Sequence, residues 1–343
     1  MIRIDGGYLE GGGQILRTSL ALSTILNKEV NIFNIRKNRS NPGLREQHLR
    51  VIEAFKDIFN SSCKGDYLGS DNIYFYPSKE IKKNYIKITP RTSASIGLIL
   101  QAVLPTIYFL DKKITLEISG GTAGKWSIPF DFYPYIIFPI LGVDADYKVE
   151  RRGYYPKGGG VVIIEFKNFS YKKIELTERG KLEKIKILSF ASEDLKIKKV
   201  AERQAEFAKN ILEERLKEVY FDIDISYFKT LSTGSELNLC AYFSGGIRLW
   251  ADALGEKSKS SEEVAKEASL KLLKEIDSNS CCDLHLADNL ILYLAFLKGK
   301  IKTSQITNHT LTNIWVCENF LGKIFKIKDN LIEVDAFSSN PLS

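Results

Sequence analysis

The chain has 343 residues, a length that predicts two domains or one elaborated domain. Of these residues 44% are hydrophobic and 27% charged, a composition typical of a soluble globular protein. Its most apolar stretch, residues 96–110, is interrupted by Gln101, Pro105 and Thr106 and falls short of a bilayer span, and the N-terminus lacks the apolar segment of a secretory signal. These features exclude a membrane or secreted protein and predict a soluble protein of the cytoplasm. The net charge of +7 gives only weak support for a polyanionic partner.

The cysteines are odd in number and have no CxxC spacing, so they predict reduced thiols and argue against a disulfide framework or a zinc site. They are Cys63, Cys240, Cys281, Cys282 and Cys317.

A pattern of strand, helix, strand, helix and two strands recurs along the chain. The first pass predicts a helix over 15–26, a strand over 29–35 and a longer helix from Pro42 to 59. The second predicts a strand over 85–88, a helix over 93–110, a strand over 114–118, an aromatic-rich helix over 130–141, and strands over 144–150 and 160–166. The third begins at 174–176 and resumes with a helix over 286–297, a strand at Ile301, a helix from Thr310, and strands over 324–327 and 331–334.

The third pass is interrupted by a block with its own pattern. It predicts strands over 185–187, 221–225 and 237–243, a helix over 200–219, and a last helix after the capping box that starts at Ser260. We therefore expect an α+β fold with three repeated βαβαββ units, each a four-stranded sheet with two helices, and a small inserted α+β domain. The predicted large domain is discontinuous, covering 1–183 and 278–343, and the inserted domain covers 184–277.

Two glycine triplets are candidate phosphate-binding segments. The first, residues 11–13, follows Glu10 and precedes a helix, where glycines let backbone N–H groups approach a phosphate. The second, residues 158–160, precedes a strand and is better explained as a tight turn or bulge. Neither matches a P-loop or a dinucleotide-binding fingerprint.

A basic loop follows the first predicted strand. Arg36, Lys37, Arg39 and Arg45, with Arg17 one turn into the first helix, could converge on a phosphate. A solvated basic loop is the better explanation for any one arginine alone, whereas several on one loop beside a glycine-rich turn fit either explanation.

Two of the three histidines lie at predicted helix starts. His48 falls on an apolar stripe and is expected to be packed. His309 follows Thr307 and Asn308, either of which could be the N-cap. At a helix N-terminus the free N–H groups attract phosphate and favour a neutral imidazole, the form required for nucleophilic attack on phosphorus. A capping or surface role is the simpler alternative.

Two further polar segments stand out. Gln101 lies inside a very apolar helix, so its amide must either satisfy neighbouring backbone or face a polar ligand. Asp288 and Asn289, at the start of the third-pass helix, could bind the hydroxyls or base of a nucleotide or could act as caps.

Together these segments resemble the RNA 3'-terminal phosphate cyclases over essentially the whole chain. The resemblance rests on residues 10–17 (EGGGQILR), 42–48 (PGLREQH), 152–160 (RGYYPKGGG), 285–289 (HLADN) and 308–313 (NHTLTN). It implies three βαβαββ units with an inserted domain. It also implies ATP-dependent conversion of an RNA 3'-phosphate to a 2',3'-cyclic phosphodiester through a histidine–AMP intermediate and an RNA(3')pp(5')A intermediate, with release of pyrophosphate and AMP.

The resemblance also assigns roles to residues. His309 would carry AMP, Glu10 would help to hold Mg²⁺ or Mn²⁺ near the triphosphate, and Gln101 would lie in the ATP site. The nucleotide segment comprises His285, Leu286, Ala287, Asp288 and Asn289. The residues expected around the RNA terminal phosphate are Arg17, Arg36, Arg39 and Gln47.

Two positions depart from the family pattern, because His285 and Asn289 stand where tyrosine and glutamine are common. The sequence therefore leaves open whether His285 stacks on the base of the nucleotide, as an imidazole can, and whether the shorter amide of Asn289 reaches the nucleotide. The sequence also leaves open the RNA substrates, activity on DNA or 5'-phosphate ends, and the oligomeric state, a homodimer included.

Two other functions compete with this one. A non-catalytic cyclase-like protein of ribosome biogenesis would lack the histidine, so His309 together with Glu10 argues for the enzyme. An enolpyruvyl transferase of related fold would leave the adenylation motifs unexplained.

Overall fold

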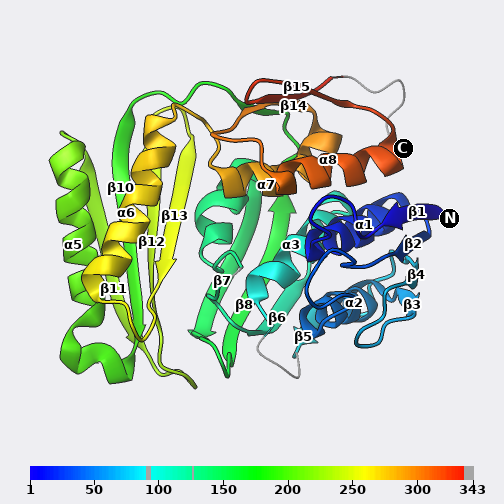
Figure 1. Ribbon diagram of the computed structural model, residues 1–343, viewed down its shortest axis with the longest axis horizontal. Helices are drawn as coiled ribbons and strands as arrows, with labels where there is room; N and C mark the ends of the chain where they lie inside the picture. The colour runs from blue at the N-terminus through cyan, green and yellow to red at the C-terminus, as the bar shows by residue number, and fades with distance from the viewer. Residues whose placement is uncertain (90–93, 126, 336–343) are drawn as a thin grey trace.

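The computed structural model describes residues 1–89, 94–125 and 127–335. The described residues form four four-stranded sheets with helices packed on them, which confirms the α+β class (Figure 1). None of the helices in these described ranges is long and apolar enough to cross a membrane.

The first sheet has the order β1-β2-β4-β3, with β1 and β2 parallel and the other pairs antiparallel. Its elements are β1 (Ile2–Asp5), α1 (Gly13–Leu26), β2 (Val30–Phe33), α2 (Glu46–Phe59), β3 (Ser62–Lys64) and β4 (Ile73–Tyr76). Helix α2 begins at Glu46 and not at the predicted Pro42. The reason is that Gly43 has a φ of +77° and its N–H donates to the carbonyl of Ile35 at 2.8 Å, which holds 42–45 in a loop.

The second sheet has the order β5-β6-β8-β7. Its elements are β5 (Tyr85–Ile88), α3 (Ile96–Phe109), β6 (Thr115–Gly120), the π-helix η1 (Tyr133–Ile137), α4 (Phe138–Leu141), β7 (Val143–Arg151) and β8 (Gly160–Phe169). Residue 93, the predicted start of α3, lies outside the described residues, and Ser95 caps the helix through the N–H of Leu98. The helix predicted over 130–141 is confirmed over 133–141, where the π-helix η1 is followed by the single turn of α4, and Pro134 and Pro139 lie in the first turns of the two.

The third sheet has the order β9-β14-β16-β15. Its elements are β9 (Ile174–Leu176), α7 (Leu284–Leu297), β14 (Gly299–Lys302), α8 (Asn308–Leu321), β15 (Phe325–Lys328) and β16 (Leu331–Val334). In each of these three sheets the first two strands along the chain are parallel and the last strand lies between the second and the third.

The fourth sheet, with order β11-β10-β12-β13, is formed by the chain between β9 and α7, and we call residues 182–277 the α5/α6 module. Its elements are β10 (Leu182–Ser192), the 3₁₀ helix η2 (Glu193–Lys198), α5 (Val200–Arg215), β11 (Tyr220–Phe228), β12 (Ser235–Phe243), β13 (Arg248–Leu254) and α6 (Ser261–Asp277). The exact boundaries of the two domains stay a prediction.

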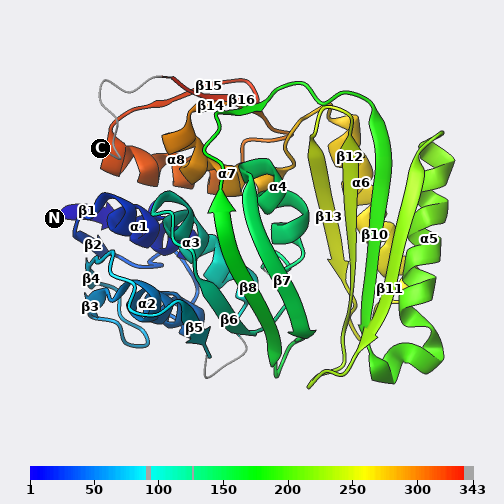
Figure 2. The same cartoon turned by 180° about the vertical axis from the view of Figure 1, so that it is seen from behind.

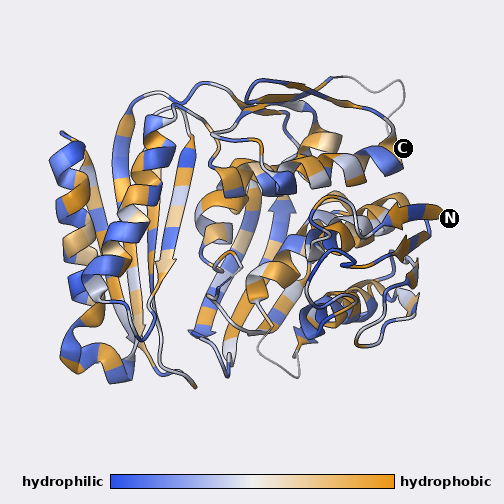
Figure 3. Cartoon of the chain, viewed as in Figure 1, coloured by the Kyte–Doolittle hydropathy of each residue, from blue (hydrophilic) through white to orange (hydrophobic). Residues whose placement is uncertain are grey.

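The core is divided between the two parts of the molecule. One hydrophobic cluster runs through the first three sheets and their helices and takes in four residues of the module, Leu188, Phe190, Cys240 and Trp250. A second cluster lies between the sheet of the module and its helices α5 and α6. From behind, the long strands β7 and β8 stand beside the module, whose helix α5 is on the far side (Figure 2). Hydrophilic and hydrophobic residues alternate along these strands, as expected for half-buried sheets (Figure 3).

The helices of the three sheets meet in the middle of the larger part, where α1 packs against α3 and α8, and α7 packs against α8. This meeting point brings the N-terminal ends of α1 and α8 together with the middle of α3. Of the polar residues singled out from the sequence, six lie on these helices, namely Arg17, Gln101, His285, Asp288, Asn289 and His309.

Candidate active site

His309 is the second residue of α8, and Thr307 is the N-cap. The Thr307 hydroxyl accepts the N–H of Thr310 at 2.9 Å, while the Thr310 hydroxyl accepts the N–H of Thr307 at 3.3 Å. This capping box settles the choice between Thr307 and Asn308 that the sequence left open. It also leaves the His309 side chain, 48% exposed, beside the positive end of the helix dipole.

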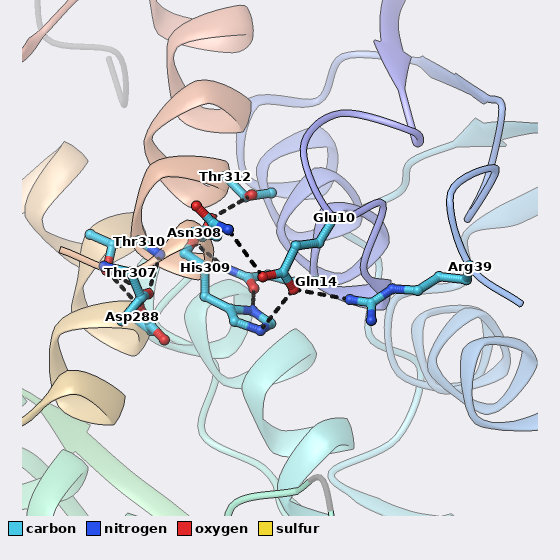
Figure 4. Close-up of polar contacts among 9 residues, drawn as sticks. All are labelled: Glu10, Gln14, Arg39, Asp288, Thr307, Asn308, His309, Thr310 and Thr312. Atoms are coloured by element: carbon cyan, nitrogen blue, oxygen red, sulfur yellow. Dashed lines mark hydrogen bonds and ion pairs between the residues drawn. The ribbon is translucent and has the colours of Figure 1, made fainter. Parts of the chain in front are cut away.

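The imidazole of His309 is held by Gln14, a residue of α1. Its Nδ1 contacts the Gln14 Oε1, and the Gln14 Nε2 donates to the backbone carbonyl of His309 at 2.6 Å. The second bond fixes the orientation of the amide, so that an acceptor faces Nδ1 and the proton of a neutral ring lies there. The lone pair is then on Nε2, which points toward Glu10 (Figure 4). Gln14 escaped the sequence analysis, because no local pattern links two residues 295 positions apart.

Glu10 lies in the loop between β1 and α1 and joins three segments. Its Oε1 accepts from the Asn308 side chain at 3.2 Å, its Oε2 accepts from Arg39 at 3.1 Å, and Oε2 is 3.8 Å from the His309 Nε2 (Figure 4). The carboxylate is 42% exposed and can therefore be reached by a ligand. Its partner Asn308 was not identified as a site residue from the sequence.

Asp288 supports the first turn of α8 from α7. Its Oδ1 accepts the hydroxyl of Thr307 at 2.8 Å and that of Thr310 at 2.6 Å (Figure 4). The backbone carbonyl of Asp288 accepts the Asn313 side chain at 2.7 Å. Burial raises the pKa of this carboxyl, and the two hydroxyls oppose the shift. Asp288 therefore buttresses the turn that carries His309.

Gln101 links three helices. Its Oε1 accepts from the Arg17 Nε at 2.7 Å, and its Nε2 donates to the Asn289 Oδ1 at 3.2 Å. The buried amide is thus satisfied by side chains of α1 and α7 and not by the backbone of its own helix. Burial lowers the pKa of Arg17 to about 10, which leaves the guanidinium charged at neutral pH.

The other residues of the predicted nucleotide segment differ in how exposed their side chains are. His285 is exposed in the first turn of α7, whereas the side chains of Leu286 and Ala287 are buried in the core. Leu286 and Ala287 can therefore meet a ligand only through their backbone. The Asn289 amide also donates to the carbonyl of His285 at 2.8 Å, which reduces its freedom to turn.

Four arginines, Arg17, Arg36, Arg39 and Arg45, lie beside the N-terminus of α1, and we call them the cationic cluster. Arg36 has a φ of +58° and its guanidinium donates to the Asn41 carbonyl at 3.1 Å. Burial and the neighbouring Arg39 and Arg45 lower the pKa of Arg36. Like charges held together in this way favour an anion between them.

His48 is 1% exposed, which confirms that it is packed, but it also lies within this cluster. Its Nδ1 accepts the N–H of Arg45 at 2.9 Å, and the Gln47 amide is 3.5 Å from its Nε2. Burial and the charges of Arg17, Arg36 and Arg45 lower the pKa of His48 to about 3. The adjacent Gly13 has no room for a side chain, since a Cβ there would lie 2.3 Å from the His48 Nε2.

The second glycine triplet is structural. Gly158 and Gly159 have φ values of +61° and +70° in the turn between β7 and β8, and a Cβ on Gly160 would lie 2.7 Å from the Gly120 carbonyl. In the same signature, Arg152 is buried and pairs with Asp131 at 2.6 Å and with Glu236 of the module at 3.0 Å. The motif therefore joins the second sheet to the module.

No group of three or more His, Cys, Asp or Glu residues within the described ranges forms a cage for a metal ion. Glu10 can still offer a single carboxylate to a cation whose other ligands are phosphate oxygens and water, which is the usual way in which Mg²⁺ is held. All five cysteines are free thiols, as predicted.

Residues 8–327 match the family model described as RNA 3'-terminal phosphate cyclase. The chain is similar to the RNA 3'-terminal phosphate cyclase of Pyrococcus abyssi, with 42% identity over 331 residues that cover 95% of each chain. It is also similar to those of Thermococcus onnurineus (41% identity, 97% of each chain) and Archaeoglobus fulgidus (39% identity, 97% of this chain and 99% of the relative).

Proposed function

The chain belongs to the RNA 3'-terminal phosphate cyclase family, and from this we propose that it uses ATP to convert an RNA 3'-phosphate into a 2',3'-cyclic phosphodiester. The observation that carries the proposal is the state of His309. Its Nδ1 faces an acceptor on Gln14, its Nε2 lies in front of Glu10, and its ring is accessible at a helix N-terminus.

In the first step, the His309 Nε2 attacks the α-phosphorus of ATP and pyrophosphate leaves. The bond between the α-phosphorus and the bridging oxygen breaks as the phosphorus–nitrogen bond forms, and Gln14 holds the ring proton on Nδ1 throughout. The free N–H groups of the first turn of α8 supply positive potential beside the phosphate. Asp288 keeps that turn in place through Thr307 and Thr310.

In the second step, AMP passes from His309 to the RNA 3'-phosphate. We assign this phosphate to the cationic cluster, where Arg17, Arg36, Arg39 and Gln47 would bind its oxygens. The vicinal 2'-OH then attacks the activated phosphate and expels AMP, helped by its fixed proximity.

The remaining assignments concern ATP. We propose that Gln101, His285, Asp288 and Asn289 line the nucleotide site with the backbone of Leu286 and Ala287. Glu10 would hold Mg²⁺ or Mn²⁺, which would neutralise the triphosphate. We place the reaction in the cytoplasm, in keeping with the free cysteines.

The test is incubation with α-labelled ATP and a divalent metal. We expect an acid-labile, base-stable protein–AMP adduct that His309→Ala abolishes, with a loss of about a thousandfold or more in labelling. At saturating ATP, His285→Ala should still label, because this histidine would line the nucleotide site and is not the nucleophile. Formation of a cyclic end on 3'-phosphorylated RNA tests the whole reaction. A wild-type protein that binds RNA and never labels would favour the non-catalytic cyclase-like alternative.

A further inference from the structure

Asp283 joins the α5/α6 module to α7 through a single carboxylate. It is the N-cap of α7 and is 1% exposed. One oxygen, Oδ1, accepts the N–H of Leu286 at 2.8 Å, and the other, Oδ2, accepts the backbone N–H of Trp250 in β13 at 3.0 Å. The two donors belong to different parts of the molecule.

The bond to Trp250 satisfies a donor that would otherwise be unpaired. Strand β13 is at the edge of its sheet, and Trp250 pairs with Cys240 of β12 on its other side. The residue is 1% exposed, and its ring packs edge-on against Phe132 with centroids 5.9 Å apart. Without Asp283, this N–H would be buried without an acceptor, which is costly.

Capping α7 does not by itself require a carboxylate. Helix α6 is capped by the hydroxyl of Ser260, which accepts the N–H of Glu263 at 3.2 Å. Asp283 is fully buried, and burial raises its pKa to about 7, so the ionised side chain is expensive to keep there. The second oxygen, and hence the link to β13, is what distinguishes it from a simple cap.

The link leads to the catalytic histidine. Five residues beyond Asp283 in α7, Asp288 accepts the hydroxyls of Thr307 and Thr310, and this pair caps the helix that begins with Asn308 and His309. The next residue, Asn289, contacts Gln101. A shift of the first turn of α7 would therefore move both the nucleotide segment and the support of His309.

We propose that Asp283 is a positioning residue for adenylation, which fixes the nucleotide-binding turn of α7 against β13 and so gives the module a part in ATP use. This inference rests on the proposed function. On this inference the module supports ATP binding by holding α7 in place, although none of its own residues reacts with the substrate.

The decisive variant is Asp283→Ser, which keeps an acceptor for the N–H of Leu286 but loses the one for Trp250. We expect the ATP concentration for half-maximal labelling of His309 to rise about tenfold in Asp283→Ser and at least as much in Asp283→Ala. Ser260→Ala, which removes an equivalent cap from α6, should leave it unchanged. If Asp283→Ser has the ATP dependence of the wild type and only Asp283→Ala is impaired, Asp283 is a helix cap and the proposal is wrong.

A second measurement does not depend on catalysis. In the nucleotide-free protein, amide hydrogen exchange in Asp283→Ser should rise both in β13 and in the first turn of α7, whereas Ser260→Ala should affect α6 alone. Unchanged exchange in β13 would overturn the link. If the wild type never labels with AMP, the proposed function fails, while this measurement still tests the coupling.

Discussion

Helices α2 and α8 each carry a histidine in the first turn: His48 is the third residue of α2, and His309 is the second residue of α8. The two rings differ in which nitrogen carries the proton. At His48 the Nδ1 accepts a backbone N–H, so the proton is on Nε2. At His309 the Nδ1 faces the Gln14 carbonyl oxygen, so the lone pair is on Nε2.

Their surroundings differ as well. His48 is 1% exposed among arginines, whereas the His309 side chain is 48% exposed beside Glu10. His48 is thus a buried neutral donor beside the cationic cluster, whereas His309 is accessible, as the nucleophilic role that we propose for it requires. The helix N-terminus is common to both histidines, so the partner of Nδ1 and the exposure of the ring together separate their chemistry.

Removing the partner of Nδ1 should have the largest effect on this contrast. Gln14→Leu removes the acceptor that faces the His309 Nδ1 and also the bond from the Gln14 amide to the His309 backbone carbonyl. We therefore expect AMP transfer to His309 to slow by about a hundredfold. Gln14→Glu is the control, because it keeps an oxygen opposite Nδ1 and should lose less. Single-turnover labelling at saturating ATP measures both. Labelling of Gln14→Leu at the rate of the wild type would mean that another group sets the tautomer.

The partner of a histidine Nδ1 is a tertiary contact that the sequence does not predict, whereas several secondary-structure elements were predicted from the sequence. Helices such as α1 and α7, with 14 residues each, were predicted almost to their ends, because apolar residues that recur over several turns are a strong signal. Short strands such as β1 and β3, with four and three residues, were not placed, since so few positions hold no clear period. Strand β13 was missed as well.

Within the site, residues with an unusual local setting could be found: His309 at a helix start and Gln101 in an apolar helix. The contacts of Gln14 with His309 and of Asp283 with Trp250 could not, because each depends on the packing of elements far apart in the chain. Backbone conformation also overrode the expected start of α2, where Gly43 turns the chain before Glu46.

The buried state of His48 should appear as a pH dependence of stability. Its pKa is about 3 in the folded protein, below the usual 6.5, so the unfolded chain binds a proton first as the pH falls. The contribution of neutral His48 to the free energy of unfolding is complete above pH 6.5 and is lost as the pH falls toward 3. Between pH 7 and pH 5, the free energy of unfolding of the wild type should fall by about 2 kcal/mol more than that of His48→Gln.

Glutamine suits this comparison because its side-chain oxygen can accept the N–H of Arg45, as the His48 Nδ1 does in the capping box. Denaturant unfolding of both proteins at the two pH values gives the difference. Equal pH dependence in the two proteins would show that His48 is not held neutral. His48→Gln should still form the His309–AMP adduct, since it leaves α8 untouched.

The cap of α8 should have the smallest effect of the three. Thr307→Ala removes the acceptor for the N–H of Thr310 and one of the two hydroxyls on Asp288, and a lost N-cap costs about 1 kcal/mol. We expect a similar loss in the free energy of unfolding and labelling of His309 that is about fivefold slower. Thr307→Ser keeps the hydroxyl and should behave as the wild type. The effect stays small because the Thr310 hydroxyl, 2.6 Å from Asp288, still ties the turn to α7. A loss in Thr307→Ala as large as that in Gln14→Leu would instead place the main support of His309 in its helix cap.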